Sequence, residues 1–117
     1  MPNPVIHFEI GCRNSEKMQQ FYSGLFDWTF QAGGPAAMAN TGSKEGIQGH
    51  LMSLGHEPHN YCVVYVQVDD LQKYLDKATK LGGKTLIPPQ EVPNMGHFAW
   101  FTDPEGTMVG LWKPMAR

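Results

Sequence analysis

The amino-acid sequence predicts an α+β fold built from two tandem βαβββ modules, and three observations predict it. Residues 5–29 and 61–85 align without gaps at a constant shift of about 56 residues, which indicates an internal repeat. Each of these segments opens with a strand-like apolar run and continues with apolar residues at helical spacing. Three further strand-like runs follow each predicted helix. We therefore expect a curved mixed sheet around a shared cleft, with the helices on its outer face.

The first module is expected to span about residues 4–55. Its first strand is predicted at 5–10, and Asn14 or Ser15 can cap the helix that follows. Three strands are then predicted at 27–31, 36–41 and 47–54. The helix is expected to bury one stripe of apolar residues at positions i, i+3, i+4 and i+7, namely Met18, Phe21, Tyr22 and Leu25.

The second module is expected to span about residues 61–114, after a polar join at 56–60 within a single domain of residues 1–117. A strand is predicted at 63–68, and Asp70 can cap a helix that Gly82-Gly83 ends. Residues 88–96 are expected to be an irregular loop, and Asp103-Pro104-Glu105-Gly106 predicts a type I turn. The remaining strands are predicted at 85–87, 96–102 and 107–112, and the buried helical stripe at Leu71, Tyr74, Leu75, Ala78 and Leu81.

Composition and charge narrow the possible partners. The chain has 117 residues and a net charge of −2, and its nine Lys and Arg residues are scattered along the chain. Nucleic acid and anionic membrane are therefore not expected as partners, since both require a concentrated basic face. No apolar run is long enough to span a bilayer and no secretory signal is visible, so we expect a cytoplasmic protein. Cys12 and Cys62 are expected to be buried, reduced thiols.

Short motifs recur in a fixed order along the whole chain. They lie at 7–10 (His-Phe-Glu-Ile), 21–22 (Phe-Tyr), 25–28 (Leu-Phe-Asp-Trp), 46–49 (Gly-Ile-Gln-Gly), 65–71 (Tyr-Val-Gln-Val-Asp-Asp-Leu), 81–83 (Leu-Gly-Gly) and 103–107 (Asp-Pro-Glu-Gly-Thr). In this order and spacing the chain resembles the vicinal oxygen chelate superfamily, which has the glyoxalase, bleomycin-resistance and extradiol-dioxygenase fold. The resemblance implies a homodimer and a ligand cleft. It implies no single reaction, because one fold can carry many functions.

In metal-dependent members of this superfamily a divalent ion is held at four places, which correspond here to His7, Gln48, Val63 and Gly110. Val63 and Gly110 have no side-chain donor, and Gln48 offers only a neutral amide oxygen. Two ligands of this kind are too few for a catalytic metal, so we expect no metal cofactor.

A different set of ligands stays open as an alternative. Side chains alternate along a strand, so His7 and Glu9 share one face, as do Gln48 and His50. His7, Glu9 and His50 could form a group of two histidines and one carboxylate, which would leave positions open for chemistry. A second possible set of ligands, if an ion binds, is His7, Gln48 and His50.

The same alternation identifies candidate ligand-binding residues. Glu9 lies within a run that is otherwise strand core, so its carboxylate must face solvent or a polar cleft. Tyr65 and Gln67 share the face of Val63, and Trp112 that of Gly110. The predicted ligand-binding residues are His7, Glu9, Gln48, His50, Tyr65, Gln67, Trp100 and Trp112.

The leading hypothesis is a small-molecule-binding protein of the glyoxalase, bleomycin-resistance and dioxygenase type, without a catalytic metal. One alternative is a metal-dependent glyoxalase-like lyase or isomerase, or a dioxygenase, which would use His7 and Gln48 as residual ligands. Glu9 would then be the candidate general base. Metal-free acid–base catalysis by Glu9 or His50 is a third hypothesis. Whether the protein is an enzyme, and whether the modules pair within or between chains, stays open.

Overall fold

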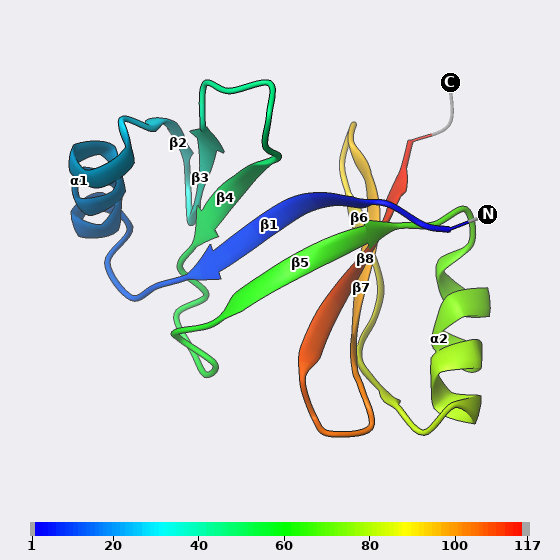
Figure 1. Ribbon diagram of the computed structural model, residues 1–117. Coiled ribbons are helices and arrows are strands. Elements are labelled where there is room, and N and C mark those ends of the chain that lie inside the picture. Colours follow the sequence, from blue (N-terminus) through cyan, green and yellow to red (C-terminus); the bar gives the residue numbers. More distant parts are fainter. Residues whose placement is uncertain (1, 116–117) are drawn as a thin grey trace. The chain divides into compact units, whose positions relative to one another are not determined.

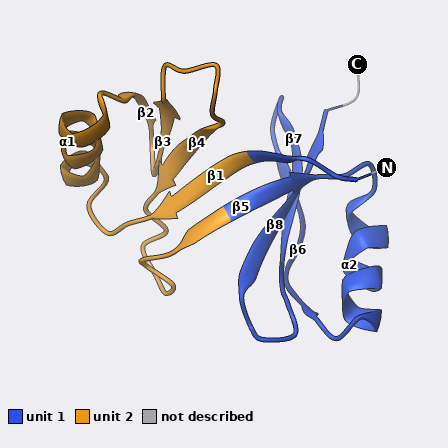
Figure 2. Ribbon diagram, in the orientation of Figure 1, with its two compact units in different colours: residues 1–6, 64–117 blue, residues 7–63 orange. Residues whose placement is uncertain are grey.

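The computed structural model describes residues 2–115 and divides the chain into two compact units (Figure 1 and Figure 2). Unit 1 comprises residues 1–6 and 64–117, and unit 2 comprises residues 7–63. Each unit carries one helix, with strands before and after it. The predicted fold class, two tandem βαβββ modules with mixed β-pairing, is confirmed. The cleft that both modules were expected to share stays a prediction.

Unit 2 holds the first module. Its strands follow the order β2-β3-β4-β1, in which β1 and β4 run parallel and the other pairs antiparallel. Cys12, Ala37 and Leu51 form its buried core on the face that α1 covers. The elements are β1 (Val5–Gly11), α1 (Ser15–Phe26), β2 (Thr29–Gly33), β3 (Ala36–Asn40) and β4 (Gln48–Met52).

Helix α1 buries less of its apolar surface than its periodicity predicts. Asn14 caps it by accepting a hydrogen bond from the backbone N–H of Lys17 at 3.0 Å. Met18 and Tyr22 pack against the core as expected. The prediction was wrong for Phe21 and Leu25, which are 55% and 57% exposed. The core beneath α1 is small, so it covers only the part of the helix that carries Met18 and Tyr22.

Unit 1 holds most of the second module, in the strand order β5-β8-β7-β6, with β5 and β8 parallel. The start of the chain belongs to this unit, because the backbone N–H of Gln67 donates to the carbonyl of Pro4 at 2.9 Å. Val68, Leu71, Leu75, Ala99 and Leu111 form its core. The elements are β5 (Cys62–Gln67), α2 (Leu71–Lys80), β6 (Lys84–Val92), β7 (Gly96–Thr102) and β8 (Met108–Pro114).

The ends of helix α2 follow the local sequence signals. Asp70 accepts from the backbone N–H of Lys73 at 3.1 Å, and Gly82 has a φ of 103° just after the C-cap. Leu71 and Leu75 are buried as predicted. Leu81 was expected in the same stripe, but it is the C-cap residue and is 71% exposed.

Strand β6 is longer than predicted. The sequence indicated a strand at 85–87 and then an irregular loop, whereas β6 continues through Pro88 and Pro89 to Val92. Its pairing with β7 shifts register between Thr85 and Ile87 and again between Ile87 and Gln90. Prolines are tolerated here because β6 is the last strand in the order and its ladder is interrupted where they lie.

Two further local predictions have different outcomes. The predicted turn after β7 is confirmed, because the N–H of Gly106 donates to the carbonyl of Asp103 at 2.9 Å. Cys12 is buried as expected, but Cys62 is exposed at the start of β5, so the prediction of a buried thiol was wrong there. Across residues 2–115, neither helix has the length and apolar character that crossing a membrane requires.

Candidate functional site

Three side chains of unit 2 form a continuous hydrogen-bonded chain on the sheet face opposite α1. His7 Nε2 and His50 Nδ1 are 2.7 Å apart, and His50 Nε2 lies 3.2 Å from Glu9 Oε1. The parallel register of β1 and β4 pairs Glu9 with His50 and places His7 two residues earlier on the same face. Glu9 is only 3% exposed, so its carboxylate is almost entirely inside the protein.

Tyr61 is the fourth side chain of this hydrogen-bonded network. The sequence did not predict it as a site residue. Its hydroxyl donates to Glu9 Oε2. Gly11 makes this contact possible, because a Cβ there would lie 2.1 Å from the Tyr61 ring, and its N–H donates to the Tyr61 carbonyl at 2.9 Å. A glycine on the same face as a buried carboxylate was the one available signal that a ring crosses the strand there.

The contacts between these side chains limit which atoms can carry the protons. The Glu9 carboxylate accepts from the Tyr61 hydroxyl and from His50 Nε2–H. In the tautomer of His50 that carries its hydrogen on Nε2, Nδ1 accepts from His7 Nε2–H. Burial and, to a smaller extent, the neighbouring His50 lower the pKa of His7 to about 4, although the nearby Glu9 acts to raise it. His7 is therefore neutral at neutral pH.

The lowered pKa of His7 predicts a pH dependence of stability. As the pH falls through 6.5, His7 takes up a proton in the unfolded chain, whereas in the folded chain it stays neutral until about pH 4. The unfolded state binds more protons in this window, so the free energy of unfolding falls with falling pH. We expect His7 to account for about 1–2 kcal/mol of this loss, since the ring is only partly shielded from water.

Urea unfolding between pH 4 and pH 7.5 measures this effect. The His7→Gln variant should show a shallower loss of stability than the wild type between pH 6.5 and pH 4. The matched control is His97→Gln, because His97 is exposed on β7 and meets water in both states. Identical curves for His7→Gln and the wild type would contradict the assignment.

The other predicted ligand-binding residues do not take part in these hydrogen bonds. Gln48 is exposed, and its Oε1 accepts from the backbone N–H of Thr41 at 2.6 Å. In unit 1, Trp100 Nε1–H donates to the Tyr65 hydroxyl at 2.8 Å, and both side chains are buried. Gln67 and Trp112 are half-buried. They pair in the register of β5 and β8.

The four places that the resemblance implies for a metal do not fit one. Val63 is buried and apolar. At Gly110, a Cβ would lie 2.5 Å from the ring of Tyr65, so that ring fills the space in which a longer side chain would begin. His7 Nε2 and Gln48 Oε1 are both engaged in hydrogen bonds within the protein. Too few side-chain atoms remain free at these four places to coordinate a divalent ion.

The alternative set of His7, Glu9 and His50 does not fit a metal either. A bound ion lies about 2.0–2.2 Å from each ligand atom and therefore between the ligands. Here the ligand atoms contact one another directly, and both nitrogens of His50 are used. Within the described range 2–115, no three His, Cys, Asp or Glu residues are placed to hold an ion.

A comparison with family models matches residues 5–111 to the Glyoxalase/Bleomycin resistance protein/Dioxygenase superfamily. The chain belongs to this superfamily. A glyoxylase-like domain-containing protein of Didymella fabae is 32% identical, with 84% of each chain covered. The anthracycline biosynthesis protein DnrV of Streptomyces peucetius is 25% identical over 96% of this chain.

Solved structures of the superfamily share the fold. Methylmalonyl-CoA epimerase from Mycobacterium tuberculosis has a TM-score of 0.65 at 11% identity, with 96% of this chain and 88% of that chain covered. At such low identity the likeness concerns the fold alone. The chain spans less than half of the length of several curated relatives that it matches, between 40% and 47% of each.

Proposed function

We propose that this superfamily member binds an organic small molecule at the unit 2 face that carries His7, Glu9 and His50, and that it needs no divalent metal to do so. The observation that supports this most directly is the 2.7 Å contact between His7 and His50. Through this contact, the ring nitrogens that would coordinate a metal instead form a hydrogen bond within the protein. Binding of an organic ligand has precedent among the structural neighbours, because one Streptomyces coelicolor methylmalonyl-CoA epimerase was solved with 2-nitronate-propionyl-CoA.

The electrostatics of His7 favour a binding role for this ring over a role as general base. A general base works best when its pKa lies near the working pH. The pKa of His7 is lowered to about 4, so at neutral pH this ring is a weak base that can exchange hydrogen bonds but rarely takes up a proton. Glu9 is buried behind His50 and acts as a positioning residue that holds the orientation of that ring.

The experiment is a thermal-shift screen of metabolite-like and drug-like aromatic compounds, combined with metal analysis of protein purified without chelator. A ligand that binds the native state raises the melting temperature. We expect ligands whose effect is the same with EDTA, zinc, nickel or manganese. Their effect should be lost in His7→Gln and His50→Gln and kept in His97→Gln.

Two results would overturn the proposal. One is a stoichiometric ion that is lost in His7→Gln, which would favour the metal-dependent lyase or dioxygenase. The other is that the ligands bind the His7→Gln and His50→Gln variants with the same affinity as the wild type. Tyr65, Trp100 and Trp112 stay predicted ligand-binding residues. The expected homodimer remains part of the proposal, and sedimentation equilibrium of the purified chain tests it.

A further inference from the structure

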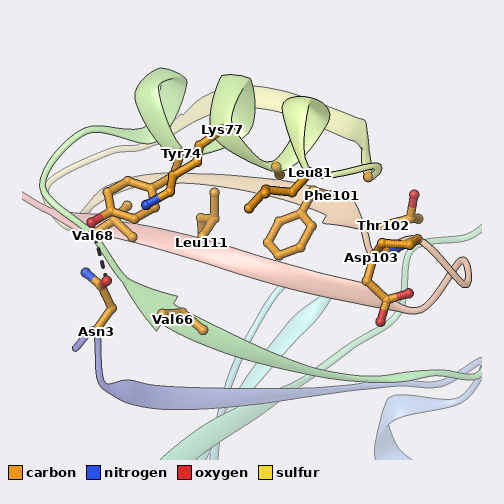
Figure 3. A pocket seen from close by; sticks show the side chains of 13 residues that line it. Asn3, Val66, Val68, Tyr74, Lys77, Leu81, Phe101, Thr102, Asp103 and Leu111 are labelled. Atoms are coloured by element: carbon orange, nitrogen blue, oxygen red, sulfur yellow. Dashed lines mark hydrogen bonds between the residues drawn. The ribbon is translucent and has the colours of Figure 1, made fainter.

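Unit 1 contains a hollow on the sheet face that α2 covers. It has a volume of about 350 Å³ and lies between α2 and strands β5, β7 and β8 (Figure 3). Val66 lines it, and since side chains alternate along β5, this is the opposite face from Tyr65. The hollow is therefore separate from the Tyr65–Trp100 pair. Its apolar walls include Val66, Val68, Tyr74, Leu81, Phe101 and Leu111.

The internal repeat explains why this hollow exists. At the shift of about 56 residues, Tyr22 of the first module corresponds to Ala78 of the second. In unit 2 the Tyr22 ring packs against the core and stacks on Trp28, with 5.6 Å between the ring centroids. In unit 1 the corresponding places hold the methyl group of Ala78, which lines the hollow, and the exposed Lys84. The second module lacks the aromatic filling of the first.

The two ends of the hollow differ in charge. Lys77 lies at the end where the Tyr74 hydroxyl donates to Asn3 Oδ1 at 3.3 Å, and Asp103 lies at the other end (Figure 3). No ion pair of Lys77 occurs among residues 2–115. Asp103 Oδ1 already accepts from the backbone N–H groups of Glu105 and Thr107. One end of the apolar hollow thus carries the ammonium group of Lys77, which has no carboxylate partner among the described residues.

We propose that this hollow binds an amphipathic monocarboxylate, such as a medium-chain fatty acid. Its apolar chain lies along Val66, Phe101 and Leu111, and its carboxylate lies at Lys77. The volume of about 350 Å³ is at the lower end of the range typical of small-molecule pockets, which suits a ligand of about ten carbons better than a complete lipid. The proposal does not depend on the function proposed for His7, Glu9 and His50, because the two sites use different residues.

Titration calorimetry with decanoate tests the proposal, with decan-1-ol as the uncharged probe. Decanoate should bind the wild type at one site, and decan-1-ol about fivefold more weakly, since a partly exposed charge pair contributes up to about 1 kcal/mol. Lys77→Gln should weaken decanoate about fivefold and leave decan-1-ol unchanged. Lys80→Gln is the matched control, because Lys80 lies on the same helix but outside the hollow. The affinity of this variant for decanoate should stay within about twofold of the wild-type value.

Ala78→Tyr gives the second module the tyrosine that the first module has at position 22. This variant should lose decanoate binding, and its ligand-free form should melt at a higher temperature than the wild type. If this variant does not fold, Ala78→Leu serves the same purpose. In the wild type, NMR signals of the Ala78, Leu81 and Leu111 methyl groups should shift on titration without any substitution. The proposal is overturned if decanoate does not bind, if it binds Ala78→Tyr or Ala78→Leu as well as the wild type, or if those methyl signals stay unchanged.

Discussion

The Glu9→Ala variant is expected to lose about 2–4 kcal/mol of unfolding free energy. Glu9 is 3% exposed and accepts hydrogen bonds from the Tyr61 hydroxyl and from His50 Nε2. Its removal takes away the acceptor of two partly or largely buried donors, and the loss of a buried hydrogen-bond partner costs about 1–3 kcal/mol. His50 also loses the contact that orients it toward His7, so ligand binding at this face should weaken in the same variant.

Glu57→Ala is the matched control, because Glu57 is an exposed glutamate in the same unit. Its carboxylate lies 3.8 Å from Arg13 and 3.4 Å from His59, and its side chain is 79% exposed. Such surface pairs contribute about 0–1 kcal/mol. Glu9→Gln keeps one acceptor oxygen and should fall between the wild type and Glu9→Ala. Equal urea midpoints for Glu9→Ala and Glu57→Ala would contradict the buried network.

The order of the elements could be predicted because it depends on local patterns. The repeat indicated the same strand and helix periods twice, and the caps at Asn14 and Asp70 are local hydrogen bonds that need no tertiary information. The degree of burial could not be predicted from these patterns. Phe21 and Leu81 have the right spacing, but burial depends on how much core lies beneath each helix. Periodicity identifies the apolar face without telling how much of it is covered.

The candidate site was predicted in part for the same reason. Strand alternation was enough to place His7 and Glu9 on one face, and the parallel register then brought His50 beside them. Tyr61 was missed because its contact with Glu9 depends on long-range pairing across Gly11. The sequence also could not tell that the polar groups would bond to one another rather than to a ligand.

A second large effect is expected at Gly110, where Gly110→Ala should cost about 2–3 kcal/mol of unfolding free energy. The added Cβ would lie 2.5 Å from two carbons of the Tyr65 ring. That ring cannot move away easily, because it is buried and its hydroxyl accepts from Trp100 Nε1–H at 2.8 Å. Overpacking of a filled core typically costs about 1–3 kcal/mol. The control is Gly46→Ala, since no atom lies within 4 Å of the Cβ that it adds.

The cause can be tested by removing the ring. In a Tyr65→Ala background the Cβ at position 110 has room, so Gly110→Ala should cost far less there than in the wild type. Residues in contact typically show coupling energies of about 0.5–3 kcal/mol in such a double-mutant cycle. Additive losses would show that the ring is not what limits this position. If the coupling is found, Gly110→Glu alone should create no metal site, because the Tyr65 ring occupies the space where that carboxylate would have to begin.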